Sequence, residues 1–235
     1  MPAYDLHIHT VKGSSDSNLT VEQLIEEARA IGLDGVGLTE HGGGWDGHEF
    51  DRVFEDAGFS VFRGLEVETD MGHVLVYGLH SYVNGIHKAA ELRRVVDRVG
   101  GVMISAHPFR NVFNRPPYNV NLLFKDSGGY PATPQEALVH PLFELVDGLE
   151  VANGSNTDQE DAFAHEVANR LGLGGTGGSD AHSVHGLGRC VTVFDAPIRS
   201  EADLIEALKA GAFTSDRGFH TRRPRGAADQ RPETE

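Results

Sequence analysis

Strand-like segments alternate with amphipathic helical ones along almost the whole chain, and no other feature restricts the fold as strongly. Candidate strands lie at 4–8, 35–39, 60–69, 73–79, 101–107, 146–153, 172–180 and 189–195. Candidate helices lie at 20–31, 48–58, 89–100, 134–146, 159–172 and 200–211. Repeated strand–helix units are typical of a mainly parallel sheet, and this many units favour closure into a barrel. The sequence therefore predicts an α/β fold.

The helical segments carry local start and stop signals. Thr20 and Gln23 form a capping-box pattern ahead of the first helix, and Gly32 suits its C-terminus. Ser200 is the expected N-cap of the last helix.

Two segments depart from the alternation. Residues 108–133 contain prolines and glycines without a clear period, and loops of this length in compact domains are usually functional or disordered. The C-terminal segment is polar and contains proline, which favours a flexible tail. We therefore expect a single domain over 1–215 and a polar tail over 216–235. The tail arginines expected to be solvated are Arg222, Arg223 and Arg225.

Composition excludes several kinds of protein. Cys190 is the only cysteine, so an internal disulfide and a thiolate zinc cluster are excluded, and any metal must be held by His, Asp and Glu. The formal net charge of −15 argues against binding long duplex nucleic acid, because duplex affinity comes largely from neutralising phosphates. No apolar run is long enough to span a membrane and no signal pattern begins the chain, so we expect a cytoplasmic location without a membrane partner.

Side chains that can bind metal ions stand at the end of nearly every predicted strand. In the segment YDLHIHT, His7 and His9 alternate, so they share one face of the strand. The other strand-end candidates are Glu40, His41, Glu66, Glu68, His73, His107, Asp180 and His182. The carboxyl ends of barrel strands form the active-site face, so we expect these side chains to converge. Imidazoles mixed with carboxylates suit zinc, manganese or iron, and their number favours two or three ions that share a bridging carboxylate.

The order of these motifs resembles that of a known family. The series DLHIHT…SSD…TEH…GLEVE…H…SAHP…GSDAH, from about residue 4 to 215, is similar to the PHP (polymerase and histidinol phosphatase) domain. The HxH pair alone is unspecific, whereas the whole series in this order is highly specific. The resemblance implies a distorted (β/α)7 barrel that binds up to three metal ions.

The resemblance also implies a ligand set, carried over motif by motif. The ligands implied around the first ion are His7, His9, Glu66 and Asp180. Those around the second are Glu66, His73 and His107, and those around the third are Asp16, His41 and His182. Every ligand position has a competent residue, which favours an active enzyme. Two departures stand out: TEH replaces the usual TDH, so Glu40, expected behind the ligands, is one methylene longer, and His80 is a rival of His73 for the second ion.

The expected activity is hydrolysis of a phosphomonoester of a small metabolite or nucleotide by a metal-bound hydroxide. Asp180 and His182 are the expected catalytic residues, since Asp180 holds an ion and an imidazole such as His182 can protonate the leaving oxygen. Arg110 is the first candidate for binding the substrate phosphate, and Arg189 is the second. We expect the loop 108–133 to cover the metal site and to set substrate choice.

Alternatives to these expectations remain open. The aromatic residues of the loop either contact the substrate or pack on the barrel rim: Phe109, Phe113, Tyr118 and Phe124. The resemblance also allows a phosphodiesterase or 5′-exonuclease on short oligonucleotides, or a non-catalytic metal-stabilised module. A metal-dependent amidohydrolase would share the barrel but usually carries a lysine ligand, for which this sequence offers no clear position.

Overall fold

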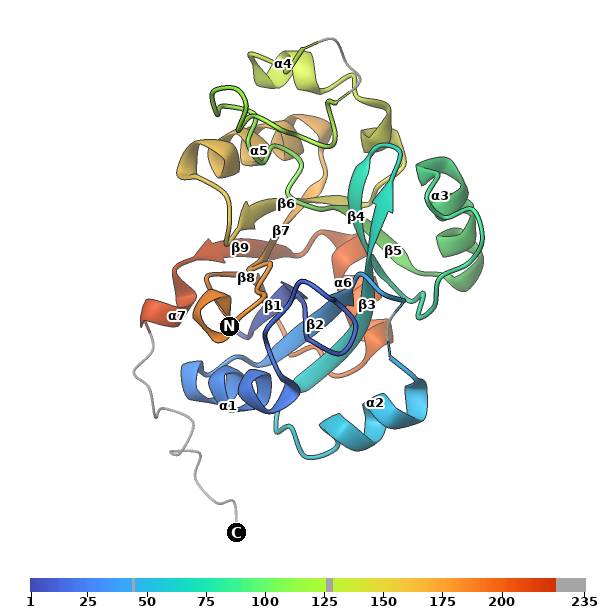
Figure 1. The fold of residues 1–235 in the computed structure, drawn as a ribbon, viewed down its shortest axis with the longest axis vertical. Coiled ribbons are helices and arrows are strands. Elements are labelled where there is room, and N and C mark those ends of the chain that lie inside the picture. Colours follow the sequence, from blue (N-terminus) through green and yellow to red (C-terminus); the bar gives the residue numbers. More distant parts are fainter. Residues whose placement is uncertain (44, 126–128, 223–235) are drawn as a thin grey trace.

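A curled sheet that nearly closes into a barrel forms the centre of the molecule (Figure 1). The computed structural model describes residues 1–43, 45–125 and 129–222, and within them the sheet has nine strands. In chain order they are β1 (Ala3–Ile8), β2 (Gly35–Glu40), β3 (Ser60–Thr69), β4 (Gly72–Tyr77), β5 (Val102–Ser105), β6 (Gly148–Asn153), β7 (Gly174–Gly178), β8 (Cys190–Phe194) and β9 (Phe213–Arg217). Their order across the sheet is β7-β6-β5-β4-β3-β2-β1-β8-β9. The predicted distorted α/β barrel is confirmed.

The sheet is evenly mixed, so the prediction of a mainly parallel sheet is wrong. The pairs β1–β2, β2–β3, β5–β6 and β6–β7 are parallel. The pairs β3–β4, β4–β5, β1–β8 and β8–β9 are antiparallel. Only two residues join β3 to β4, and Gly72 takes a positive φ of 93° at this turn. So short a connection can only reverse the chain, because parallel strands need a long crossover.

The barrel closes where the chain after β7 meets β1. The backbone N–H of Asp180 donates to the carbonyl of His7 at 2.7 Å, and that of His9 donates to the carbonyl of Ala181 at 3.0 Å. The N–H of Ser179 donates to the buried carboxylate of Asp5 at 2.8 Å. Closure therefore brings the strand end that carries Asp180 beside the one that carries His7 and His9.

Helices cover the outside of the sheet (Figure 1). The longer ones are α1 (Val21–Ile31), α2 (Gly47–Phe54), α3 (Ala89–Val99), α5 (Asp158–Leu171) and α6 (Glu201–Ala210). The short ones are α4 (Pro134–Ala137), α7 (Phe219–Arg222) and the 3₁₀ turns η1 (Pro141–Glu144) and η2 (Val184–Gly186). The helix expected over 134–146 is instead α4 and η1, interrupted before Pro141, whose ring cannot continue the preceding helix. Among the described residues, no helix has the length and apolar character needed to cross a membrane.

The chain stays regular beyond residue 215. Strand β9 runs to Arg217, and α7 ends at Arg222, whose guanidinium lies 2.5 Å from the carboxylate of Asp216. The rest of the expected tail, with Arg223 and Arg225, lies outside the described residues.

Three buried apolar clusters attach the helices to the sheet. One packs α3 and α5, the second α1 and α2, and the third α6. By contrast, five described strand residues with carboxylate or imidazole side chains are at most 2% exposed: Asp5, His7, Glu40, Glu66 and Glu150. Buried ionisable groups are rare unless they are paired or bind metal, so this polar centre marks the candidate site.

Candidate metal centre

The strand ends bring the predicted ligands together in three overlapping groups. In each group, one ligand atom per residue lies within 4.8 Å of the others. The groups are His7, His9, Glu66 and Asp180; Glu66, His73 and His107; and His9, His41 and His182. Glu66 belongs to two groups and so does His9, which makes one continuous cluster.

The first group has the donor pattern of a metal site. The Nε2 atoms of His7 and His9 are buried and have no hydrogen-bond partner among the described residues. His7 Nε2 lies 3.3 Å from Glu66 Oε2 and 3.4 Å from Asp180 Oδ1. His9 Nε2 lies 3.2 Å and 3.3 Å from the same two oxygens. Unpartnered imidazole nitrogens that face carboxylate oxygens fit a divalent cation, which would satisfy all four atoms.

The charges of the first group point the same way. Burial alone lowers the pKa of His7, but the carboxylates of Glu150, Asp180 and Glu66 outweigh it and hold that pKa well above its ordinary value. Burial raises the pKa of Glu66, yet His7 and its other imidazole neighbours bring it well below the ordinary value. The carboxylates of this group therefore favour positive charge between the two imidazoles and themselves, which protons or a metal ion can supply.

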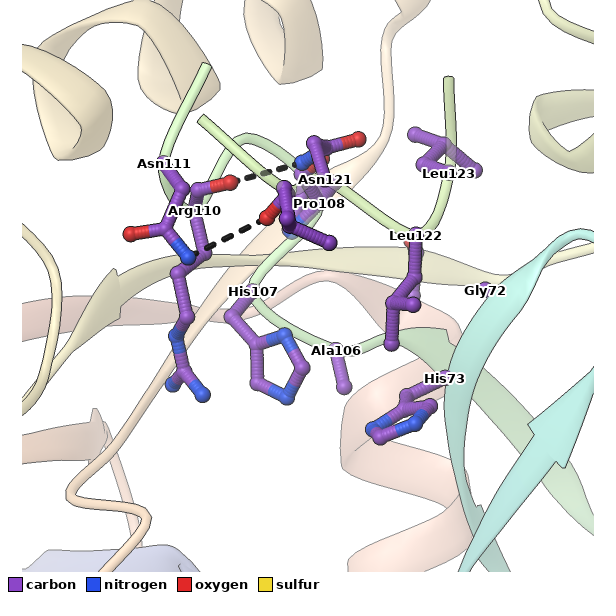
Figure 2. Close-up of a pocket in the computed structure, with 12 residues that line it drawn as sticks. Gly72, His73, Ala106, His107, Pro108, Arg110, Asn111, Asn121, Leu122 and Leu123 are labelled. Carbon is purple, nitrogen blue, oxygen red and sulfur yellow. Dashed lines mark hydrogen bonds between the residues drawn. The ribbon is translucent and has the colours of Figure 1, made fainter. Parts of the chain in front are cut away.

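The second group uses the other oxygen of Glu66. Oε1 lies 2.8 Å from His73 Nδ1 and 3.0 Å from His107 Nε2, and Figure 2 shows both rings beneath the loop that follows His107. With Oε2 on the first group and Oε1 on the second, Glu66 has the geometry of a bridging carboxylate. His80, the rival of His73, instead contacts Arg63 at 3.0 Å and Glu201 at 2.6 Å, away from this group.

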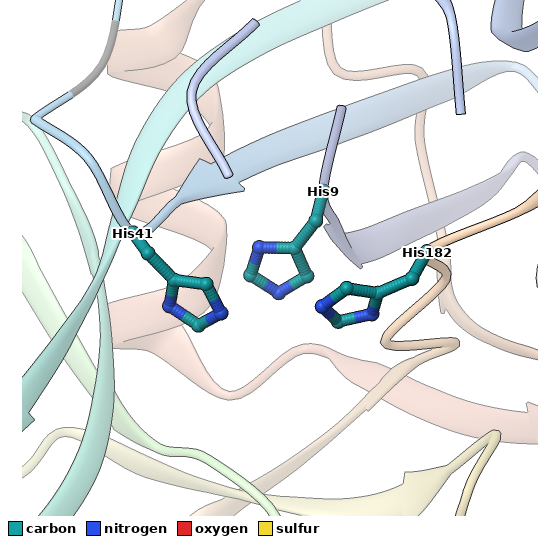
Figure 3. Close-up of side chains that lie close together, drawn as sticks. All are labelled: His9, His41 and His182. Atoms are coloured by element: carbon teal, nitrogen blue, oxygen red, sulfur yellow. The ribbon is translucent and has the colours of Figure 1, made fainter. Parts of the chain in front are cut away.

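The third group lies at the mouth of the cluster (Figure 3). His41 and His182 are partly exposed, while buried His9, which the resemblance did not assign here, has its ring between theirs. Asp16 is 59% exposed, and its Oδ2 lies 3.3 Å from His182 Nε2 and 3.6 Å from His41 Nε2. The structure thus places Asp16 beside the two histidines with which it was grouped.

Two carboxylates behind the ligands fix the imidazole rings. Glu150, which sequence reasoning missed, is fully buried and accepts from His7 Nδ1 at 3.0 Å and from the His107 backbone at 2.8 Å. Glu40 accepts from Ser14 Oγ at 2.7 Å, and Ser14 Oγ lies 3.1 Å from His9 Nδ1. These contacts hold Nδ1 protonated and leave Nε2 free for an ion, as hydrogen-bonded partners of metal-binding histidines do.

Backbone geometry also constrains the site. His107 and Asp180 have positive φ angles of 30° and 54°, which are uncommon for residues other than glycine. At Gly178, a Cβ atom would lie 2.4 Å from the Cβ of His7 and 2.6 Å from Glu150 Oε1. Only glycine therefore fits beside the contact between His7 and Glu150.

The two arginines proposed for phosphate binding differ in position. The Arg110 guanidinium lies 2.5 Å from Asp180 Oδ2 and 2.7 Å from Asn153 Oδ1, at the edge of the first group. Arg189 is exposed next to η2, and the contacts of the described residues do not join its side chain to the cluster. Glu68 is exposed and is not part of any of the three groups, although its backbone lies opposite that of His73 in the β3–β4 register.

The first and middle parts of the loop 108–133, at 108–111 and 120–123, lie at the edge of the cluster, but most of the loop's aromatic residues are structural. Phe109 is fully buried, and Phe124 is 5% exposed and stacks on it at 5.8 Å between ring centroids. Phe113 packs on Phe163, whereas Tyr118 is 76% exposed.

Solved structures share this fold at low sequence identity. PsfC from Pseudomonas syringae has a TM-score of 0.64 and 19% identity, over 94% of this chain and 93% of its own. A proposed metal-dependent phosphoesterase from Bifidobacterium adolescentis has a TM-score of 0.56 and 17% identity, over 89% and 96%. An amidohydrolase from Chromobacterium violaceum, solved with sulfate and without metal, has a TM-score of 0.52 and 18% identity, over 87% and 96%.

Sequence comparison extends to a curated protein and to family models. Ribonuclease P protein component 3 of Natronomonas pharaonis is 30% identical over 106 residues, which are 43% of this chain and 44% of that relative. The chain thus matches less than half of that relative's length. A family model of PHP-associated sequences matches residues 160–213, and the PHP domain model matches residues 5–133, more than half of the chain. With this match and the ligand motifs gathered at the strand ends, the chain belongs to the PHP domain family.

Proposed function

We propose that this protein hydrolyses a phosphomonoester of a small metabolite or nucleotide in a metal-dependent reaction. Family membership and the histidine–carboxylate cluster support the broader statement that it is a metal-dependent hydrolase. The observation that carries the proposal is the pair of Glu66 oxygens, each facing a separate group of imidazoles. Adjacent cation sites that share a carboxylate suit a phosphoryl group, whose several oxygens all need charge neutralisation in the transition state.

Two or three divalent ions are the cofactors that this cluster would hold, and manganese, zinc and iron suit its ligands. His7, His9, Glu66 and Asp180 would hold the first, with His73 and His107 completing the second. His41, His182 and Asp16 would hold the third. When bound, such ions act as Lewis acids toward phosphoryl oxygens and water.

Binding of the substrate phosphate and protonation of the leaving oxygen fall to side chains at the edge of the metal cluster. Arg110 lies beside Asp180 with part of its planar set of N–H donors uncommitted to that carboxylate, which suits an oxygen of the substrate phosphate. His182 donates from Nδ1 to the carbonyl of Asp180 at 3.1 Å, so Nε2 faces the site. With no third ion on Nε2, His182 is placed to deliver a proton to the leaving oxygen.

One comparison favours a second candidate function. The curated relative is a protein component of ribonuclease P, which supports a role on RNA, as a phosphodiesterase on short oligonucleotides or as a non-catalytic module. The net charge of −15 disfavours long duplex partners but not short strands.

A screen of substrates separates these candidates. The manganese-loaded protein is assayed against phosphomonoesters, phosphodiesters and short 5′-phosphorylated RNA, with Asp180→Asn as the inactive control and His80→Ala as the matched histidine control. Turnover of monoesters that Asp180→Asn abolishes and His80→Ala retains supports the proposal. Turnover of diesters or RNA alone supports the second candidate, and metal binding without turnover of any ester supports the non-catalytic module.

A further inference from the structure

A cavity of about 270 Å³ opens beside the second ligand group. Its floor includes His73 and His107, and its roof is the first and last part of the segment 108–123 (Figure 2). A substrate whose phosphate lies on the cluster would therefore have this cavity next to its leaving group. The volume is slightly below the range of about 300–1,000 Å³ that is typical of small-molecule sites.

The walls of the cavity are mainly apolar. Leu122 projects from the loop toward Ala106 and His73, with Leu123 and Pro108 on either side (Figure 2). Val120 also lines the cavity and is 62% exposed at its entrance.

The amide side chains of the lining are occupied by the loop itself. Asn121 Nδ2 donates to the carbonyls of Pro108 at 2.9 Å and Arg110 at 2.8 Å, and its Oδ1 accepts from the Phe124 backbone. Asn111 Nδ2 donates to the carbonyl of Val120 at 3.1 Å. These amides hold the roof in place, whereas Ser105 Oγ, which is buried without a hydrogen-bond partner among the described residues, is a free polar group of the lining.

The cavity lacks spare positive charge. Of the described residues that line it, Arg110 is the only one with a permanent charge, and the proposed function assigns its free N–H donors to the phosphate on the cluster. A second phosphate placed here would be desolvated without a cationic partner, which is unfavourable.

We propose that this cavity receives the leaving group of the phosphomonoester and selects a compact, uncharged and partly apolar group. This inference rests on the proposed function and deepens it. Phenyl phosphate matches this chemistry, methyl phosphate leaves the cavity empty, and a nucleoside 3′,5′-bisphosphate places a second anion in it.

The test changes the size of the cavity at Leu122. Leu122→Trp should fill the cavity and raise KM for phenyl phosphate about tenfold, with kcat/KM for methyl phosphate within about twofold of the wild type. Leu122→Ala should enlarge the cavity and favour 1-naphthyl phosphate over phenyl phosphate. Val139→Trp, at an exposed position away from the cavity, is the matched control. Equal effects of Leu122→Trp on phenyl and methyl phosphate, or a wild-type preference for the bisphosphate, would overturn the inference.

A binding measurement separates this inference from the proposed function. Phenylphosphonate cannot be hydrolysed at an ester bond, so its affinity for the manganese-loaded protein reports on the cavity without turnover. Binding that Leu122→Trp weakens and Val139→Trp does not supports the cavity even if no monoester is hydrolysed. If monoesters are hydrolysed but Leu122→Trp does not change phenylphosphonate binding, the inference is wrong and the proposed function is still supported.

Discussion

At the scale of single residues, Glu150 holds the cluster in place without being one of the predicted ligands. It is fully buried, and besides His7 and His107 it accepts from Asn153 Nδ2 at 2.9 Å. Glu150→Gln keeps the volume but removes the charge that favours Nδ1–H on His7. We expect manganese affinity to fall about 10–100-fold, as for other partners of metal-binding histidines. Competition titration with a chelator measures this, and exposed Glu144→Gln should leave the affinity unchanged. Equal affinities in both variants would show that Glu150 does not orient His7.

Asp161 should impose a pH dependence on stability. Burial raises its pKa from 3.8 to about 6, although the Arg217 guanidinium beside it works in the opposite direction. The folded state then binds a proton that the unfolded state has already released, so stability falls as pH rises from about 4 to about 6 and is level above that. In Asp161→Asn, the free energy of unfolding should lack this fall with pH, which amounts to up to about 3 kcal/mol across the window.

Denaturant unfolding of both proteins at several pH values checks the effect. Asp5, whose pKa is also raised to about 6, contributes equally to wild type and variant, so their difference isolates Asp161. A constant difference from pH 4 to pH 7 would mean that Asp161 titrates normally.

The structure brings together most of the candidate residues that stand at strand ends. His7 and His9 alternate in the sequence, and such spacing fixes a shared face whatever the rest of the fold does. Glu150 was missed because it lies inside its strand, where a lone carboxylate does not reveal whether it faces the barrel interior. Asp5 had a usable signal, since it lies two residues before His7 on the same face.

At the scale of elements, local signals predicted helices better than strand directions. Thr20 and Gln23 form the expected capping box, and Gly32 ends the helix with a φ of 74°. Such caps depend on a few neighbouring residues, whereas strand direction depends on partners far along the chain. Strand β9 was missed because FTSDR lacks an apolar alternation; its Arg217 serves a polar network instead.

That network should make β9 important for the site. Arg217 pairs with Asp161 and donates to the backbone carbonyls of Asn153 at 3.0 Å and Asn156 at 2.7 Å. The side-chain oxygens of Asn153 and Asn156 in turn accept from Arg110. Arg217→Lys loses the planar fork that makes these contacts together, so Arg110 should shift.

We expect a rise of about tenfold in KM for a phosphomonoester, with kcat and manganese affinity closer to wild type. Arg222→Lys, which changes an exposed ion pair on α7, is the matched control. If Arg217→Lys leaves KM unchanged, or if both variants raise KM equally, Arg217 does not position Arg110.

At the scale of the whole molecule, the centre of the barrel gathers four buried carboxylates, and Arg110 pairs with one of them, Asp180. Asp5, Glu66, Glu150 and Asp180 are at most 9% exposed, in a chain with a net charge of −15. Local pattern predicted that Glu66 and Asp180 meet here, but not Asp5 or Glu150. It also did not predict the closure through residues 179–181 that joins β7 to β1, because that contact spans most of the chain. Metal binding should therefore stabilise the closed barrel as well as provide chemistry.

Manganese should raise the midpoint of thermal unfolding. A single site at a free ion concentration 100 times the dissociation constant adds about 2.7 kcal/mol, which corresponds to about 5–10 °C for a domain of this size. His9→Ala should lose most of this shift, because His9 belongs to two of the three groups. His80→Ala should keep it, since His80 contacts Arg63 and Glu201 away from the cluster. Calorimetry with manganese and after chelation measures both variants, and a full shift retained in His9→Ala would show that the ion binds elsewhere on the molecule.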